Sequence, residues 1–80
     1  MLRVSRNTVK ETLTPEPDSI IVDFHTSEAY KSNTVSVWQN GIRLIQHWDD
    51  GFTELGGTTI RFSEPPLYGD TLQVEYERLV

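Results

Sequence analysis

The sequence predicts an all-β protein, built as a small antiparallel β-sandwich or open barrel of six to seven short strands. Three observations predict this fold. Apolar and polar residues alternate in several short segments, and turn residues such as Asn-Gly and Gly-Gly separate these segments. In addition, no segment carries apolar residues at helical spacing for two full turns. A chain of 80 residues is enough for one domain, and short strands at regular intervals are typical of sandwiches and barrels.

The first segment is separated from the rest by Pro15-Glu16-Pro17, whose prolines push the preceding residues to extended geometry. We expect residues 1–17 to form an N-terminal arm or an edge strand and residues 18–80 to form the β-sandwich module. The arm is polar and rich in threonine, which favours extended structure. It can add a strand to a neighbour's sheet edge, with Arg3, Arg6 and Lys10 pairing with an acidic surface. The alternative is a frayed terminus.

The next two strands are expected at residues 20–26 and 34–39, where β-branched and aromatic residues are dense. In the first, Ile20, Val22 and Phe24 share one face because side chains alternate along a strand. We expect that face to point into the protein.

Asn40-Gly41 lies between two alternating segments and is the strongest hairpin signal in the chain. A two-residue type I′ turn needs positive φ at both positions, and asparagine and glycine tolerate this best. The return strand is expected over residues 42–48.

Three more strands are expected at residues 52–55, 58–63 and 71–77, separated by glycine-containing turns and a proline-containing loop. Gly69 and Asp70 end that loop. Together with Asn40 and Gly41, we expect them to be structural turn residues. The residues predicted to form the core are Val35, Val37, Ile42, Leu44, Ile60, Phe62, Leu72, Val74 and Tyr76.

An ordered set of motifs over about residues 20–76 resembles a small β module of phage tail-fibre, neck and other virion appendage proteins. The motifs are Phe24–Tyr30, Asn33–Trp38, Gln39–Leu44, the acidic turn and aromatic segment Asp49–Glu54, Thr58–Phe62, and Gly69-Asp70 before Leu72–Tyr76. Trp48 departs from the pattern, because a glycine or small polar residue usually stands there.

The resemblance implies a structural component of a phage virion, in the tail, neck or fibre or as a capsid decoration. Such a protein is made in the host cytoplasm and ends in the virion. Its partners would be other virion proteins and copies of itself, and appendage proteins of this kind often form trimers. The absence of cysteine also favours an oligomer, since a small domain without disulfides often gains stability from neighbours. A compact monomer is the alternative.

Charge and hydropathy exclude several classes of partner. The formal net charge of −5 argues against nucleic-acid binding, which depends on lysine and arginine neutralising phosphate. The longest apolar run, residues 20–22, is too short to span a membrane, and no signal peptide is expected.

Candidate sites are few. Trp38, Trp48, Tyr30 and Tyr68 could stack on sugar rings if several lie exposed together, which gives a carbohydrate-binding module for host attachment as the alternative function; core or interface packing is the simpler interpretation. Neither a metal site nor a cofactor is expected, because a calcium loop needs a longer frame than the acidic turn provides. No catalytic motif appears, so we expect no enzyme. The acidic residues considered as metal ligands are Asp49, Asp50 and Glu54. His25 and His47 are not spaced as a pair of metal ligands.

Overall fold

The computed structural model describes residues 8–79, which form seven strands in two antiparallel sheets. The first sheet has the strand order β1-β7-β3-β4 and the second has the order β2-β6-β5. No helix occurs between residues 8 and 79, so the predicted all-β fold is confirmed. The strands are β1 (Thr8–Thr12), β2 (Asp23–His25), β3 (Ser36–Gln39), β4 (Ile42–Arg43), β5 (Phe52–Gly56), β6 (Thr59–Phe62) and β7 (Leu72–Glu77).

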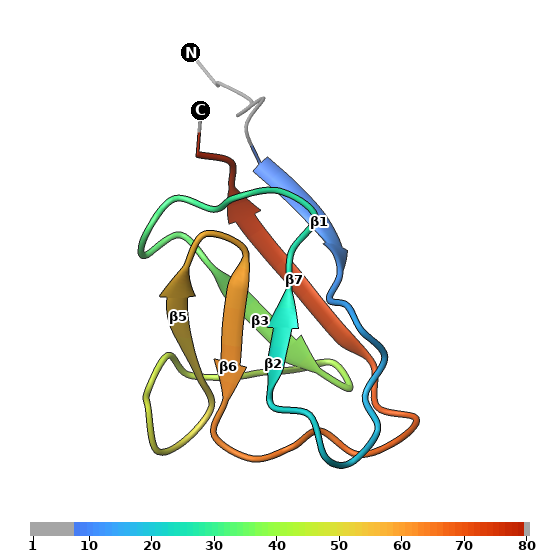
Figure 1. Cartoon of the computed structure of the whole chain (residues 1–80). Helices are drawn as coiled ribbons and strands as arrows, with labels where there is room; N and C mark the ends of the chain where they lie inside the picture. Colours follow the sequence, from blue (N-terminus) through green and yellow to red (C-terminus); the bar gives the residue numbers. More distant parts are fainter. Residues whose placement is uncertain (1–7, 80) are drawn as a thin grey trace.

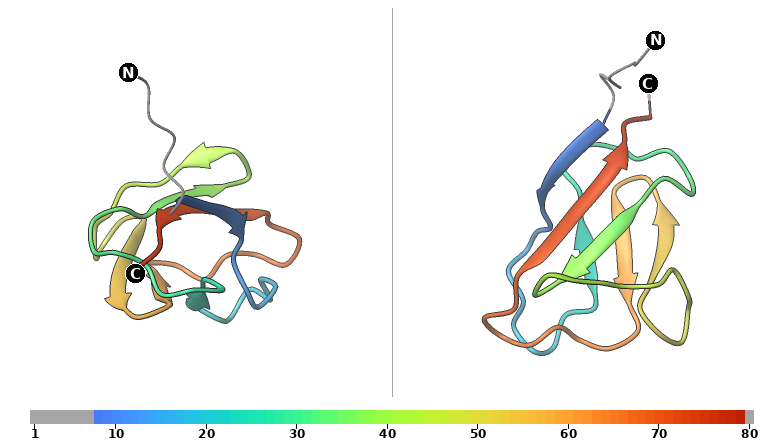
Figure 2. Two further views of the ribbon diagram at one scale, coloured as in Figure 1. Left: turned by 90° about the horizontal axis from the view of Figure 1, so that it is seen from above. Right: turned by 180° about the vertical axis from the view of Figure 1, so that it is seen from behind.

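The two sheets lie face to face as the layers of a small sandwich (Figure 1; Figure 2, left). Apolar side chains from both inner faces fill the space between them, and burying them is the main stabilising term of such a fold. Single bridges connect the sheets at their open sides, Thr14 to His25 and Gln46 to Phe52, which gives the sandwich a partly closed, barrel-like outline. The buried apolar residues are Leu13, Phe24, Tyr30, Val35, Val37, Phe52, Ile60, Phe62, Leu72, Val74 and Tyr76.

Strand β7 is central to the first sheet and follows its predicted alternation. Leu72, Val74 and Tyr76 are buried, while the residues between them face outward. The strand pairs with β1 on one side and β3 on the other, so its backbone groups have partners in both directions.

The predicted turn at Asn40-Gly41 is present. Both residues have positive φ, 53° and 83°, as a type I′ turn requires, and β3 and β4 pair across it with Gln39 opposite Ile42. The Asp70 carboxylate accepts hydrogen bonds from the Asn40 and Gln39 side-chain amides, at 2.9 Å and 2.8 Å. The contact ties the hairpin turn to the loop that ends in Gly69, which also has positive φ.

Three predictions about the extent of the strands and the burial of their residues are wrong. Strand β4 contains only Ile42 and Arg43 instead of running to residue 48, because the chain then leaves the first sheet and crosses to β5. Ile42 is 69% exposed, so it is not a core residue, whereas Leu44 is half-buried against the core. Ile20 was expected to point inward and is exposed, since the strand that follows it begins only at Asp23.

The N-terminal segment is an edge strand as far as the structure describes it. Strand β1 pairs with β7 of the same chain, and Leu13, just beyond it, is fully buried. From residue 8 onward the segment pairs within its own chain, so the alternative of a frayed terminus is wrong for this part. Arg3 and Arg6 lie outside the described residues, and Lys10 lies on β1 with its side chain exposed.

Candidate functional site

Three loops gather at one end of the sandwich, opposite the end where β1 begins and β7 finishes (Figure 1; Figure 2, right). We call this surface, formed by residues 15–22, 44–51 and 63–70, the loop end. Backbone amides connect its loops: Ser19 N–H donates to the Pro66 carbonyl at 3.0 Å, and Tyr68 N–H donates to Ser19 Oγ at 2.9 Å. Ser63 N–H donates to the Gly51 carbonyl at 3.0 Å. The loops are thus joined by hydrogen bonds into one continuous surface.

The loop end exposes large apolar side chains. Trp48 is 75% exposed and Tyr68 is 83% exposed, and neither contributes to the core between the sheets. Trp48 stacks on the neighbouring His47 ring, with 5.7 Å between ring centroids. Large exposed apolar side chains on loops that hydrogen bonds join are candidates for contacts with another molecule. The other exposed apolar residues of the loop end are Ile20, Ile45 and Leu67.

The same surface is acidic. Its three loops contain six carboxylates and neither lysine nor arginine. Two of the carboxylates are structural: Asp18 accepts hydrogen bonds from the amides of Ile20 and Ile21, and Asp70 accepts those described above. Hydrogen bonds lower the pKa of both groups, from the Ile21 and Ile20 amides at Asp18, and chiefly from Asn40 and Gln39 at Asp70. The four remaining carboxylates, all exposed, belong to Glu16, Asp49, Asp50 and Glu64.

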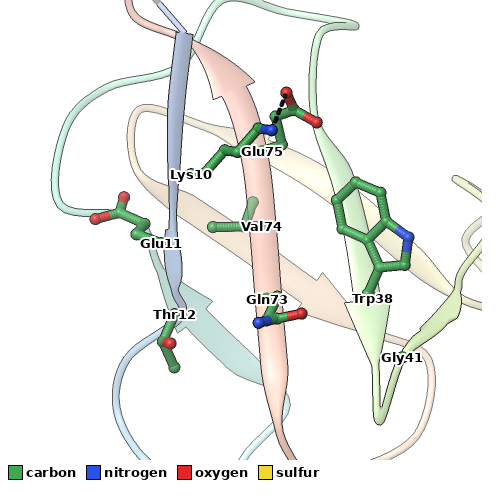
Figure 3. A pocket seen from close by; sticks show the side chains of 8 residues that line it. All are labelled: Lys10, Glu11, Thr12, Trp38, Gly41, Gln73, Val74 and Glu75. Carbon is green, nitrogen blue, oxygen red and sulfur yellow. Dashed lines mark ion pairs between the residues drawn. The ribbon is translucent and has the colours of Figure 1, made fainter.

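A second surface lies on the outer face of the first sheet, where β1, β7 and β3 form a shallow groove of about 450 Å³ (Figure 3). We call it the Trp38 groove. Strand register explains its composition, because Thr12, Gln73 and Trp38 lie directly opposite one another on adjacent strands, with Arg43 next in the row. The adjoining row consists of Lys10, Glu75 and Ser36.

The Trp38 groove combines an aromatic ring with polar groups. The half-buried Trp38 stands on β3 beside the Gln73 side chain of β7 (Figure 3). One end of the groove is formed by Lys10 and Glu75, whose charged atoms are 3.9 Å apart. Within residues 8–79, no hydrogen bond involves the side chain of Gln73, so its amide is available to a ligand.

A polar network that the sequence did not reveal closes the gap between β1 and the loop after β2. Tyr76 donates its hydroxyl hydrogen to Glu11 at 2.5 Å, and Ser27 N–H donates to the same carboxylate oxygen at 3.0 Å. Burial raises the pKa of Glu11, but the hydrogen bonds from Tyr76 and Ser27 outweigh it and leave that pKa below its usual value. Burial and the contact with Glu11 raise the pKa of Tyr76. The network stabilises the fold.

The four aromatic residues proposed for sugar stacking are not brought together. Tyr30 is a core residue, 3% exposed, whose hydroxyl donates to the Thr59 carbonyl and accepts from the Gly56 amide, so it is removed from that set. Trp38 lies in its groove, whereas Trp48 and Tyr68 lie at the loop end. The pairing of β7 with β1 on one side and β3 on the other creates the groove, and no local sequence pattern signals that strand order.

The acidic turn shows no metal site. Within residues 8–79, no group of three or more histidine, cysteine or acidic side chains is placed to hold a metal ion. Asp49 and Asp50 are exposed in the turn, while Glu54 accepts a hydrogen bond from the Asn33 amide at 2.9 Å. No helix in the same residues could cross a membrane.

These two surfaces are the candidate sites within residues 8–79. Comparisons with protein-family models, with curated proteins and with solved structures find no match, so the resemblance to phage appendage modules stays a prediction.

Proposed function

We propose that this chain is a structural component of a phage virion, in the tail, neck or fibre or as a capsid decoration, and acts through protein–protein contacts. The observation that carries the proposal is the loop end. Exposed apolar side chains stabilise a fold little, and here they lie on loops that hydrogen bonds already hold in place. An ordered apolar surface of this kind is suited to a protein partner, because little ordering entropy is lost when it binds.

The small size of the protein supports the same proposal. Its sandwich encloses a single thin apolar layer, and domains of this size gain stability by association. The acidic loops can in addition steer a basic partner toward the apolar residues, because complementary charge speeds encounter and selects partners.

The proposal is tested on purified phage particles that carry this gene. We expect mass spectrometry of intact, nuclease-treated particles to detect the chain in a fixed ratio to the major structural proteins. A matched sample of lysate depleted of particles controls for carry-over. Absence from particles, with abundant chain in the depleted lysate, would contradict the proposal.

A second function, glycan binding for host attachment, is favoured by the Trp38 groove. Sugar rings stack on aromatic faces, and amides or hydroxyls beside the ring fix their orientation. Trp38 with Gln73 and Thr12 supplies both kinds of group on neighbouring strands. The groove is open and shallow, which suits a short glycan at the surface of a larger molecule.

The chain offers matched controls for this function. We expect binding on a glycan array to be lost in Trp38→Ala and kept in Trp48→Ala, since Trp48 lies outside the groove. The same contrast is expected between Gln73→Ala and Gln46→Ala. Loss of binding in both tryptophan variants alike, or no binding by the wild-type chain to any glycan, would contradict the assignment.

A further inference from the structure

We propose that the loop end binds the basic N-terminal segment, residues 1–7, of a second copy of the chain, so that subunits join head to tail. The inference rests on the proposed structural role and names the partner of its contact surface. Two features of the surface lead to it, the exposed apolar residues and the charge around them.

The loop end needs a partner that is both apolar and basic. Trp48, Leu67 and Tyr68 present apolar area, and the exposed carboxylates around them carry negative charge that no lysine or arginine of the three loops offsets. A purely apolar partner would leave those carboxylates without a counter-charge, and a purely basic one would leave the apolar area in water.

Residues 1–7 have the complementary composition. They contain Arg3 and Arg6 and no acidic residue, and Leu2 and Val4 stand on either side of Arg3. Arginine suits this role because its guanidinium can donate two parallel hydrogen bonds to one carboxylate. The segment thus pairs its two positive charges with the acidic loops and its apolar residues with the exposed tryptophan and tyrosine.

The described part of the chain begins at the end of the subunit opposite the loop end. Strand β1 begins with Thr8 opposite Glu77 of β7, at the end of the sandwich farthest from the loop end (Figure 1). A contact between unlike ends of two copies is heterologous, and it generates a ring or a filament. The arrangement differs from strand addition at a sheet edge, since it requires the loops and their charges.

The test is sedimentation velocity of the full chain over a concentration series at low salt. We expect self-association whose dissociation constant rises with salt concentration, because the contact is charged. Reversing either side, in R3E/R6E or in D49K/D50K, is expected to weaken association at least about tenfold, since attraction becomes repulsion. Combining the two pairs of substitutions restores opposite charges and is expected to recover association to within about threefold of wild type.

A matched control reverses two acidic residues away from the loop end. E54K/E75K, on strands β5 and β7 between the two ends of the sandwich, changes the net charge by the same amount as D49K/D50K and is expected to leave association intact. Circular dichroism of each variant checks that the β fold is kept. A monomer at all concentrations, association that is insensitive to salt, or charge-swapped chains that do not recover would overturn the head-to-tail contact. The proposed virion role is measured separately, in particles, and survives that result.

Discussion

Strand β7 and the loop before it are adjacent in the chain, but the apolar residues of the strand are buried and those of the loop are exposed. In β7, Leu72, Val74 and Tyr76 are buried to within 1–2%. In the preceding loop, Leu67 and Tyr68 are exposed although the backbone there is held by hydrogen bonds to Asp70 and Ser19. A strand that pairs with a neighbour on each side and is covered by the second sheet buries its apolar residues. Hydrogen bonds alone hold a loop in place without covering its side chains. Apolar residues of the second kind are free to contact other molecules.

The largest test of this contrast removes a core ring. Phe24 is fully buried and packs edge-to-face against Phe62, with ring centroids 5.3 Å apart. We expect Phe24→Ala to lower the free energy of unfolding by about 3–5 kcal/mol, because it deletes a large side chain and leaves a cavity. At the loop end, Leu67→Ala is expected to change it by less than about 0.5 kcal/mol. Urea denaturation measures both, and equal losses would break the contrast.

The next test concerns the backbone of the loop end. A Cβ added to Gly51 would lie 2.0 Å from the Ile45 carbonyl oxygen, and its φ is +109°. We expect Gly51→Ala to cost about 3 kcal/mol, near the upper range for a strained backbone position. Gly57 also has positive φ, but a Cβ there meets nothing within 4 Å, so Gly57→Ala is expected to cost about 1 kcal/mol. Similar midpoints for the two variants would show that the loop is not fixed as described.

Removing one hydroxyl tests the polar network beside β1. Tyr76→Phe deletes the donor to Glu11 and the acceptor for the Glu28 amide, so we expect a loss of about 1–2 kcal/mol in the free energy of unfolding. The exposed Tyr68 provides the control, because Tyr68→Phe removes a hydroxyl that makes no hydrogen bond within residues 8–79. Chemical denaturation of the pair is expected to separate them clearly, and a Tyr76→Phe curve that overlays wild type would contradict this role.

A smaller effect is expected at acid pH. The folded-state pKa of Asp70 lies below its usual value of 3.8, because Asn40, Gln39 and the Leu67 amide donate to the carboxylate. The unfolded chain therefore binds the proton more readily, so this contribution is full above about pH 4 and is lost as the pH falls through the folded-state pKa. We expect Asp70→Asn to flatten the decline of unfolding free energy below pH 4. As the control, we expect Asp50→Asn to show the wild-type decline of unfolding free energy below pH 4. Identical pH profiles for the two variants would contradict the role of Asp70.

Local signals predicted much of the fold. Asn40-Gly41 specified its turn through backbone preference alone, and the alternation in Leu72–Glu77 specified which residues of that strand are buried. Both signals are contained in a few consecutive residues. Ile20 shows where such a signal fails, because the Asp18 side chain binds the amides of Ile20 and Ile21 and keeps them in a turn before the strand starts.

Non-local pairing explains the features that the sequence left open. Leu13 is buried because β1 pairs with β7, more than sixty residues further along the chain. The Trp38 groove depends on the same pairing, since Thr12 and Gln73 become neighbours only in the sheet order β1-β7-β3. The loop end likewise joins three loops from separate parts of the sequence. Alternating apolar residues and turn residues are local features, so they do not show which distant segments of the chain become neighbours.

The most direct measurement is the thermal unfolding midpoint of the double variant Trp48→Ala/Tyr68→Ala, followed by circular dichroism. We propose that these exposed rings serve contacts between molecules and not the fold. We therefore expect the midpoint of the monomer at low protein concentration to stay within about 4 °C of wild type, equivalent to less than about 1 kcal/mol. A fall of more than about 10 °C would place both rings in the stability of the fold and contradict the account.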